Sequence, residues 1–102
     1  MKKVRITVLK KLFFEDVVKE YGAEGLTPCP ALQEGQVFES TGFKPAGFCD
    51  DAWNCIQKYV FALCAGADNF FDGTWVKKDT VQIGSCCDGL RPVLFRIETV
   101  ED

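Results

Sequence analysis

The chain has 102 residues, of which 47% are apolar and 26% charged, and its formal net charge is -3. This length and composition are typical of one globular domain and exclude an intrinsically disordered chain. The acidic balance excludes the basic surface that non-specific nucleic-acid binding requires, and the absence of histidine excludes Ser-His-Asp and Cys-His catalysis.

The first residues, MKKVRITVLKK, combine basic and apolar side chains. Arg5, Lys10 and Lys11 interrupt the apolar stretch, so we do not expect a signal peptide. The sequence also lacks a run of about 18 apolar residues, the length that a membrane span needs. We therefore expect no membrane partner and a cytoplasmic protein whose thiols are mostly reduced.

The start of the chain predicts a strand followed by a short helix. Val4, Ile6 and Val8 alternate with polar residues, which is typical of a strand with one buried face. Apolar residues then recur at helical spacing over 14–21, acidic side chains occupy the first turn, and Gly22 follows as a stop.

The middle of the chain predicts one long amphipathic helix. Residues 36–39 first predict a second short strand, after which glycine and proline interrupt regular structure. The helix is expected to begin at Cys49 or Asp50 and to end at Gly66. One face of it gathers these residues: Cys49, Trp53, Ile56, Val60, Leu63 and Cys64. We expect this helix to pack across the sheet with Trp53 buried between them.

The next segment combines an aromatic loop with further strands. Residues 75–78 and 80–86 predict two strands or one bent strand. Phe70, Phe71 and Trp75 are either buried in the core or form an interaction surface, through which the chain would self-associate.

Asp88-Gly89 is the strongest turn signal in the sequence. The last strand places Val93 and Phe95 on one face, which favours a three-residue loop over 87–89. That loop would pair Ile83 with Val93 and Val81 with Phe95. It would also place Cys87 at its tip and give Gly89 a positive φ.

These elements predict one α+β domain over residues 1–102. We expect a mainly antiparallel sheet of four or five strands, in which the first strand lies next to the last one, with one long and one short helix. Pairing the first and last strands would place Lys3 and Arg5 near Glu98, which matches their charges.

Three segments resemble the motifs of a family of prokaryotic proteins of about 100 residues that has no established activity. The segments are Cys29-Pro30, Pro45 to Cys49 with Ala52-Trp53 behind it, and Cys87-Asp88-Gly89-Leu90-Arg91-Pro92-Val93. The resemblance covers nearly the whole chain and implies no substrate or cofactor. It places Cys29, Cys49 and Cys87 inside the motifs and the other three cysteines outside them.

The remaining cysteines have simpler expected roles. Cys64 faces the predicted core, where a thiol acts as a small apolar side chain. Cys55 lies off the apolar face of the helix and is expected to be a partly exposed bystander. Cys86 and Cys87 are neighbours, so we expect them to point to opposite sides and not to share one site.

Two of the candidate residues allow two interpretations each. Cys49 begins the long helix, whose unpaired N–H groups favour a reactive thiolate, but Asp50 and Asp51 oppose that effect and leave a structural role open. Arg91 can clamp a carboxylate or phosphate, or it can pair with Asp88 and hold the turn.

The candidate functional cluster comprises Cys29, Cys49, Cys87, Asp88 and Arg91, which we expect at one end of the sheet. Three thiolates with Asp88 would suit zinc or an iron-sulfur cluster, but the C-x-x-C spacing is absent, so we predict no cofactor. No catalytic base or phosphate loop is identified. We expect a small-ligand-binding or protein-interaction module, and the alternative is a thiol- or metal-dependent redox protein or enzyme using the three cysteines.

Overall fold

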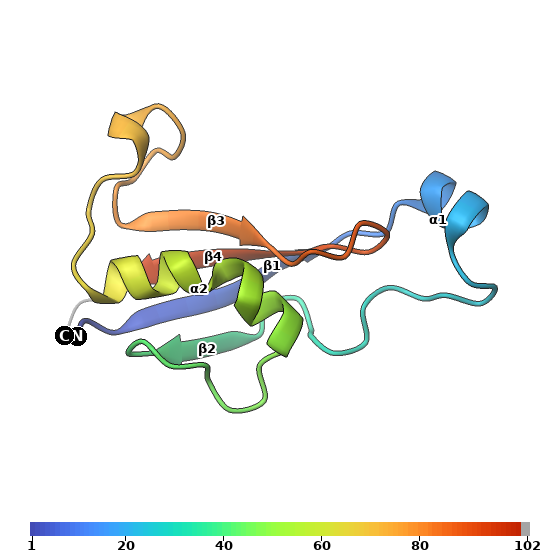
Figure 1. Ribbon diagram of the computed structural model, residues 1–102, viewed down its shortest axis with the longest axis horizontal. Coiled ribbons are helices and arrows are strands. Elements are labelled where there is room, and N and C mark those ends of the chain that lie inside the picture. Colours follow the sequence, from blue (N-terminus) through green and yellow to red (C-terminus); the bar gives the residue numbers. More distant parts are fainter. Residues whose placement is uncertain (101–102) are drawn as a thin grey trace.

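In the computed structural model, which describes residues 1–100, one long helix crosses a face of a four-stranded antiparallel sheet (Figure 1). The strands are β1 (Val4–Lys11), β2 (Val37–Ser40), β3 (Val81–Ser85) and β4 (Val93–Thr99), in the order β2-β1-β4-β3. The helices are α1 (Glu15–Tyr21) and α2 (Asp50–Cys64), with a 3-10 turn η1 at Phe71–Gly73. The predicted α+β class is confirmed.

The first and last strands are neighbours at the centre of the sheet, as predicted. Arg5 on β1 lies opposite Glu98 on β4. The ion pairs nevertheless form elsewhere, because β2 flanks β1 on its other side. Lys3 and Arg5 lie 3.9 and 3.8 Å from carboxylate oxygens of Glu39, and Glu98 pairs with Arg96 at 2.6 Å.

The core lies between α2 and the face of the sheet that α2 covers. The alternating residues of β1 and β4 are buried as predicted: Val4, Ile6, Val8, Val93, Phe95 and Ile97. From α2 the buried residues are Ala52, Ile56, Val60, Leu63 and Cys64. Apolar burial on this scale is the main stabilising contribution to a small domain.

Trp53 packs against the core but is only partly buried, and not buried between helix and sheet as the sequence predicted. Its ring packs edge-on against Phe48, with centroids 6.1 Å apart. A side chain of this size is rarely covered completely by one interface. Its outer edge lines a surface hollow together with Phe43 and Phe61.

The β3–β4 hairpin has a longer loop than the sequence predicted. Ile83 lies opposite Arg96 and not opposite Val93, which displaces the predicted register by three residues. The Cys86 N–H donates to the Val93 carbonyl at 3.0 Å, so the loop comprises residues 87–92. The residues of a loop this long do not follow the strand pattern, in which successive side chains point to opposite faces of the sheet.

The register was missed because the buried face of β3 is not its apolar face. Gln82 and Gly84 are buried, whereas Val81 lies opposite Glu98 and not opposite Phe95. Gly84 occupies the position opposite Phe95. Glutamine and glycine on the core side of β3 leave no hydrophobic alternation in the sequence. The apolar residues of β3 therefore led to the prediction that its other face is buried.

The predicted strand at 75–78 is irregular chain in the structure. Phe71 and Asp72 adopt left-handed φ values of 58° and 52° at η1, which is incompatible with an extended strand there. The Val81 N–H then donates to the Lys78 carbonyl at 3.1 Å, so a turn occupies the residues directly before β3. The aromatic loop therefore leads into the sheet without adding a strand to it.

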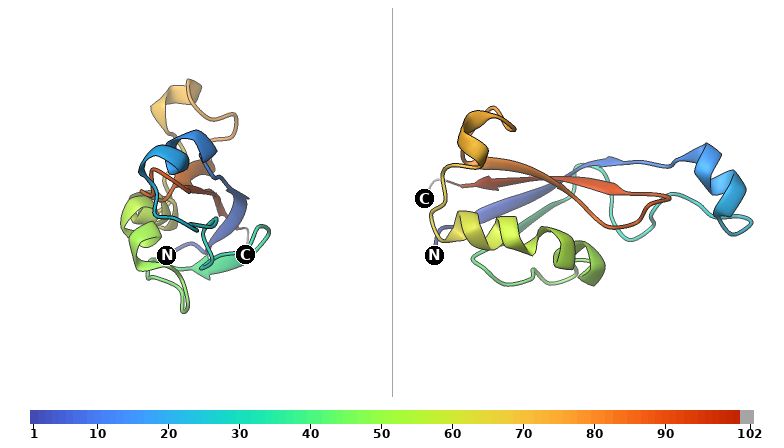
Figure 2. Two further views of the ribbon diagram at one scale, coloured as in Figure 1. Left: turned by 90° about the vertical axis from the view of Figure 1, so that its right-hand side faces the viewer. Right: turned by 45° about the horizontal axis from the view of Figure 1, so that its top comes forward.

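Helix α1 lies at the far end of β1, away from α2 (Figure 2). It forms as predicted but buries none of its residues, and the side chains of Phe14 and Tyr21 are 40% and 75% exposed. The chain then returns through an irregular segment toward β2 (Figure 1). Among residues 1–100, neither helix has the length and apolar character to cross a lipid bilayer.

Candidate functional site

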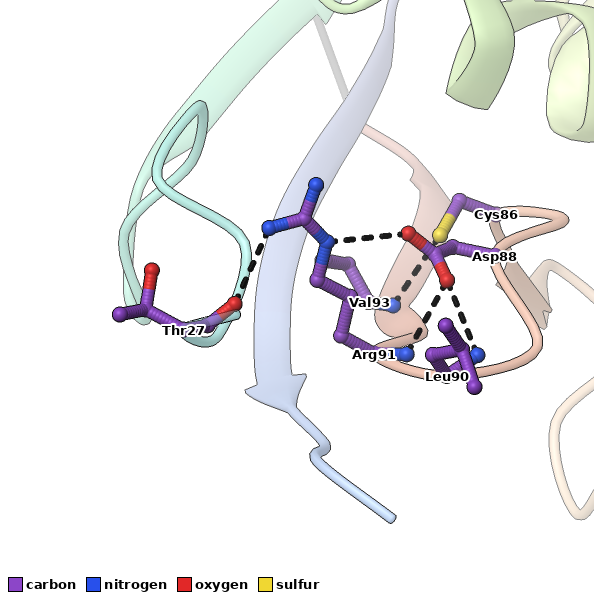
Figure 3. Close-up of polar contacts among 6 residues, drawn as sticks. All are labelled: Thr27, Cys86, Asp88, Leu90, Arg91 and Val93. Carbon is purple, nitrogen blue, oxygen red and sulfur yellow. Dashed lines mark hydrogen bonds and ion pairs between the residues drawn. The ribbon is translucent and has the colours of Figure 1, made fainter. Parts of the chain in front are cut away.

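The β3–β4 loop is organised around the carboxylate of Asp88 (Figure 3). One oxygen accepts the N–H groups of Leu90 and Arg91 at 2.9 and 3.1 Å, and the other accepts the Arg91 Nε at 3.1 Å. The hydrogen bond from Leu90, followed by those from Arg91 and its charge, lowers the pKa of Asp88 despite partial burial. The structure thus contains the Asp88–Arg91 pair that was one of the two interpretations of Arg91.

This side-chain turn explains why Gly89 differs from the prediction. Gly89 lies outside the left-handed region, so no glycine bulge is present. An aspartate that accepts the N–H groups two and three residues ahead closes a turn without a positive φ. Cys87 is accordingly the first residue of the loop and not its tip.

A second contact of Arg91 joins this loop to a distant part of the chain. Its Nη1 donates to the carbonyl of Thr27 at 3.0 Å (Figure 3). Thr27 stands two residues before Cys29, in the irregular segment after α1. One guanidinium therefore holds the Cys29 segment against the Cys87 loop, because its several N–H donors can reach two acceptors at once.

A cavity of about 430 Å³, here called the thiol cavity, opens where three segments meet. The irregular segment, the start of α2 and the β3–β4 loop line it, through Cys29, Pro30, Ala31, Cys49, Asp51, Cys86, Cys87, Asp88 and Arg91. The structure thus brings together all five residues of the candidate cluster, and their functional role stays a prediction.

Cys49 lines this cavity from the N-cap position of α2, with φ -65° and ψ 128°. Its carbonyl accepts the N–H of Trp53 at 2.9 Å, which begins the helical hydrogen bonds. Asp50 forms an ion pair with Lys44, so part of the negative charge beside the thiol is balanced. The Cys49 thiol is half-buried and makes no capping hydrogen bond of its own.

Two cysteines that sequence reasoning set aside belong to this region. Cys86 lines the same cavity as Cys87, because the chain leaves the sheet here and strand alternation no longer separates neighbours. Its Sγ accepts the Val93 N–H at 3.2 Å. Cys55, which was expected to be a partly exposed bystander, is half-buried and packs against the core.

The surroundings of Cys55 change its acidity. Burial, the Cys87 thiol, the Cys86 thiol and the Asp51 carboxylate together raise the pKa of Cys55 above its ordinary value.

No protein-family model, curated protein or solved structure matches the chain. The family resemblance suggested by the cysteine motifs stays a prediction. The site itself is therefore the basis for any functional argument.

Cys64 is buried as predicted, and its Sγ lies 3.7 Å from the carbonyl oxygen of Ser40. It ends α2, whereas Cys49 precedes the first residue of that helix.

Within residues 1–100, no three Cys, Asp or Glu side chains are arranged to hold a metal ion. A larger hollow of about 600 Å³ beside Trp53 and Phe61 has no cysteine in its lining.

Proposed function

We propose that the protein is a small-ligand-binding module whose binding site is the thiol cavity. The observation that carries this proposal is the convergence of three separate segments on one cavity, with Arg91 tied to both Asp88 and Thr27. The cavity volume of about 430 Å³ lies within the range of roughly 300–1,000 Å³ that is usual for small-molecule sites.

The side chains around the cavity favour a neutral or cationic ligand over an anion. Arg91 is the one basic residue in the lining, and its charge is matched by Asp88 at 3.1 Å. Asp51 adds a second carboxylate, so the formal charge of the lining is negative when the thiols are protonated. Thiols and aliphatic groups form most of the remaining wall, which suits an apolar ligand or one with a soft atom.

Native mass spectrometry of the protein, purified anaerobically, tests this proposal. We expect a species heavier than the bare chain. Ala31 is exposed and lines the cavity, so Ala31→Trp should fill the cavity and abolish that species without disturbing the core. Ala65→Trp is the matched control, since Ala65 is exposed and lies about 24 Å along α2 from Cys49.

Only the bare mass in the wild-type protein, or an adduct that survives Ala31→Trp, would contradict the proposal. Metal analysis of the same sample addresses the alternative, a thiol- or metal-dependent protein using Cys29, Cys49 and Cys87. A stoichiometric content of zinc or iron would favour that alternative.

The proposal includes a cytoplasmic location. Its support is the six free thiols, which a reducing compartment would keep unpaired.

The aromatic loop supports a second proposal, self-association. Phe71 and Trp75 are 67% and 52% exposed, although their rings pack edge-on with centroids 5.3 Å apart. Phe70 instead packs against Tyr59 in α2, so only part of the predicted Phe70, Phe71 and Trp75 surface is free. This exposed apolar pair, of which Phe71 has a left-handed backbone with a φ of 58°, supports a contact with another protein surface.

Sedimentation velocity at increasing concentration tests self-association. The wild-type chain should form a larger species, and Phe71→Ser should remain monomeric at the same concentration. Phe61→Ser is a control, because Phe61 is 60% exposed on α2 outside this loop. A wild-type chain that stays monomeric throughout would rule the proposal out.

A further inference from the structure

The hollow of about 600 Å³ beside Trp53, here called the Trp53 hollow, lies between α2 and the loop that follows β2. Phe43 and Lys44 line it from the loop, and Trp53, Lys58 and Phe61 line it from α2. It shares no lining residue with the thiol cavity. The two sites are therefore separate surfaces of one scaffold.

The α2 side of the Trp53 hollow is a stripe of side chains along one flank of the helix. Trp53, Gln57 and Phe61 stand four residues apart, so their side chains are neighbours on the helix surface. Trp53 packs edge-on against Phe48, with ring centroids 6.1 Å apart, which fixes one end of the stripe. Phe61 at the other end is 60% exposed. The helix thus presents aromatic surface that the core does not use.

The loop side of the hollow is held in place by the buried Ser40. Its hydroxyl oxygen accepts the Gly42 N–H at 3.0 Å, and the hydroxyl donates to the Phe43 carbonyl at 2.6 Å. Phe43 is nevertheless 80% exposed. An aromatic side chain that a fixed loop holds in solvent is preorganised for a contact, because the loop need not be ordered on binding.

The exposure of these walls favours a protein segment over an enclosed small molecule. Small-molecule sites usually cover about 70–90% of their ligand. Walls that are themselves 80% exposed at Phe43 and 60% exposed at Phe61 cannot enclose a ligand to that extent. They can cover one large side chain of a partner, and aromatic residues are enriched at such contacts.

The charges of the Trp53 hollow favour an acidic partner. Its lining contains two lysines and no carboxylate. Lys44 is paired with Asp50, but Lys58 belongs to none of the ion pairs formed within residues 1–100. The Lys58 Nζ instead lies 5.2 Å from the centroid of the Tyr59 ring. Because the chain as a whole has a net charge of -3, this unmatched ammonium is a local exception on an acidic protein.

We propose that the Trp53 hollow is the docking site for a partner protein, which binds through an acidic segment that contains an aromatic residue. The aromatic side chain packs against Phe43 and Phe61, and a neighbouring carboxylate pairs with Lys58. The Gln57 amide provides both a donor and an acceptor for the backbone of the segment. This function goes beyond ligand binding in the thiol cavity and does not depend on it.

Peptide selection followed by NMR tests the proposal. Short random peptides displayed on phage are selected against the immobilised wild-type chain, and we expect the enriched peptides to be acidic and to contain an aromatic residue. One enriched peptide is then synthesised and titrated into isotope-labelled protein. Of the two indole N–H signals, that of Trp53 should shift, and that of Trp75 in the aromatic loop should not.

Substitutions in the hollow separate the aromatic contact from the charge. Phe61→Ser should weaken binding of the synthesised peptide roughly tenfold or more, because a central aromatic contact is lost. Lys58→Glu should weaken it by roughly tenfold, because a like charge then faces the acidic segment. Lys58→Arg keeps the positive charge and should bind nearly as the wild type does.

Lys19→Glu is the matched control for the charge reversal. It makes the same change at an exposed position of α1, which lies away from α2 (Figure 2). A charge that far from the hollow is largely screened by salt, so the affinity should stay within about twofold of wild type. Ala31→Trp should also bind the peptide as wild type does, so that failure of the ligand proposal and failure of this one are distinguishable.

Several results would overturn the proposal. Enriched peptides without a preference for negative charge would do so, as would a selection in which no peptide depends on Phe61 for binding. A Trp75 signal that shifts in place of the Trp53 signal would locate the peptide elsewhere. A Trp53 signal that shifts with protein concentration alone would assign the hollow to a second copy of the chain.

Discussion

Replacing Phe95 with alanine is expected to lower the free energy of unfolding by about 3–5 kcal/mol. Phe95 is fully buried in β4 at the centre of the sheet. It lies opposite Val8 on β1 and Gly84 on β3, and its ring centroid is 5.5 Å from that of Phe48. Its removal leaves a cavity that the two flanking strands, fixed by their hydrogen bonds, cannot close.

Urea denaturation followed by circular dichroism measures this effect. Leu94→Ala on the same strand is the control, because Leu94 is only partly buried. We expect its cost to be about 1 kcal/mol, the centre of the range for ordinary substitutions. Equal losses in the two variants would mean that the β4 face assignment is wrong.

Gly84→Val is expected to destabilise the fold by about 2–3 kcal/mol through overpacking. A Cβ at this position would lie 3.0 Å from Ile56 Cγ2 and 3.3 Å from Ile97 Cδ1. Valine adds two further methyl groups against the same atoms. Helix α2 would have to lift from β3.

Gly89→Val is the matched control for this substitution. No atom lies within 4 Å of a Cβ built at Gly89, and its φ is not positive, so we expect a change within about 0.5 kcal/mol. The two variants therefore test the close approach at Gly84 against a glycine that needs no special conformation. A larger loss at Gly89 would favour the left-handed turn that the sequence predicted.

Much of the fold follows from local patterns in the sequence. Val4, Ile6 and Val8 alternate because β1 is covered on one face only, and the structure buries all three. The helical spacing of the apolar residues in α2 similarly identifies its packed face, apart from the partly exposed Trp53. Both patterns arise for the same reason: one side of the strand or helix is buried in the core, and the other side faces water.

The candidate site was also partly visible in the sequence. Cys29, Cys49 and Cys87 stand in loop segments or at an element boundary, and side chains at one end of a scaffold often meet. The Asp88–Arg91 pair could be inferred from their short separation. The charge and the missing histidine further limited the chemistry that such a site can perform.

The β3 register and the close approach of α2 to β3 were decided only by the tertiary structure. Gln82 and Gly84 occupy the buried face of β3, where no hydrophobic pattern marks them. At Gly84 helix α2 passes so close to β3 that a Cβ would lie 3.0 Å from Ile56 Cγ2. The angle at which a helix packs on a sheet depends on the side chains of every element at the interface. It therefore cannot be predicted from any single segment of the sequence.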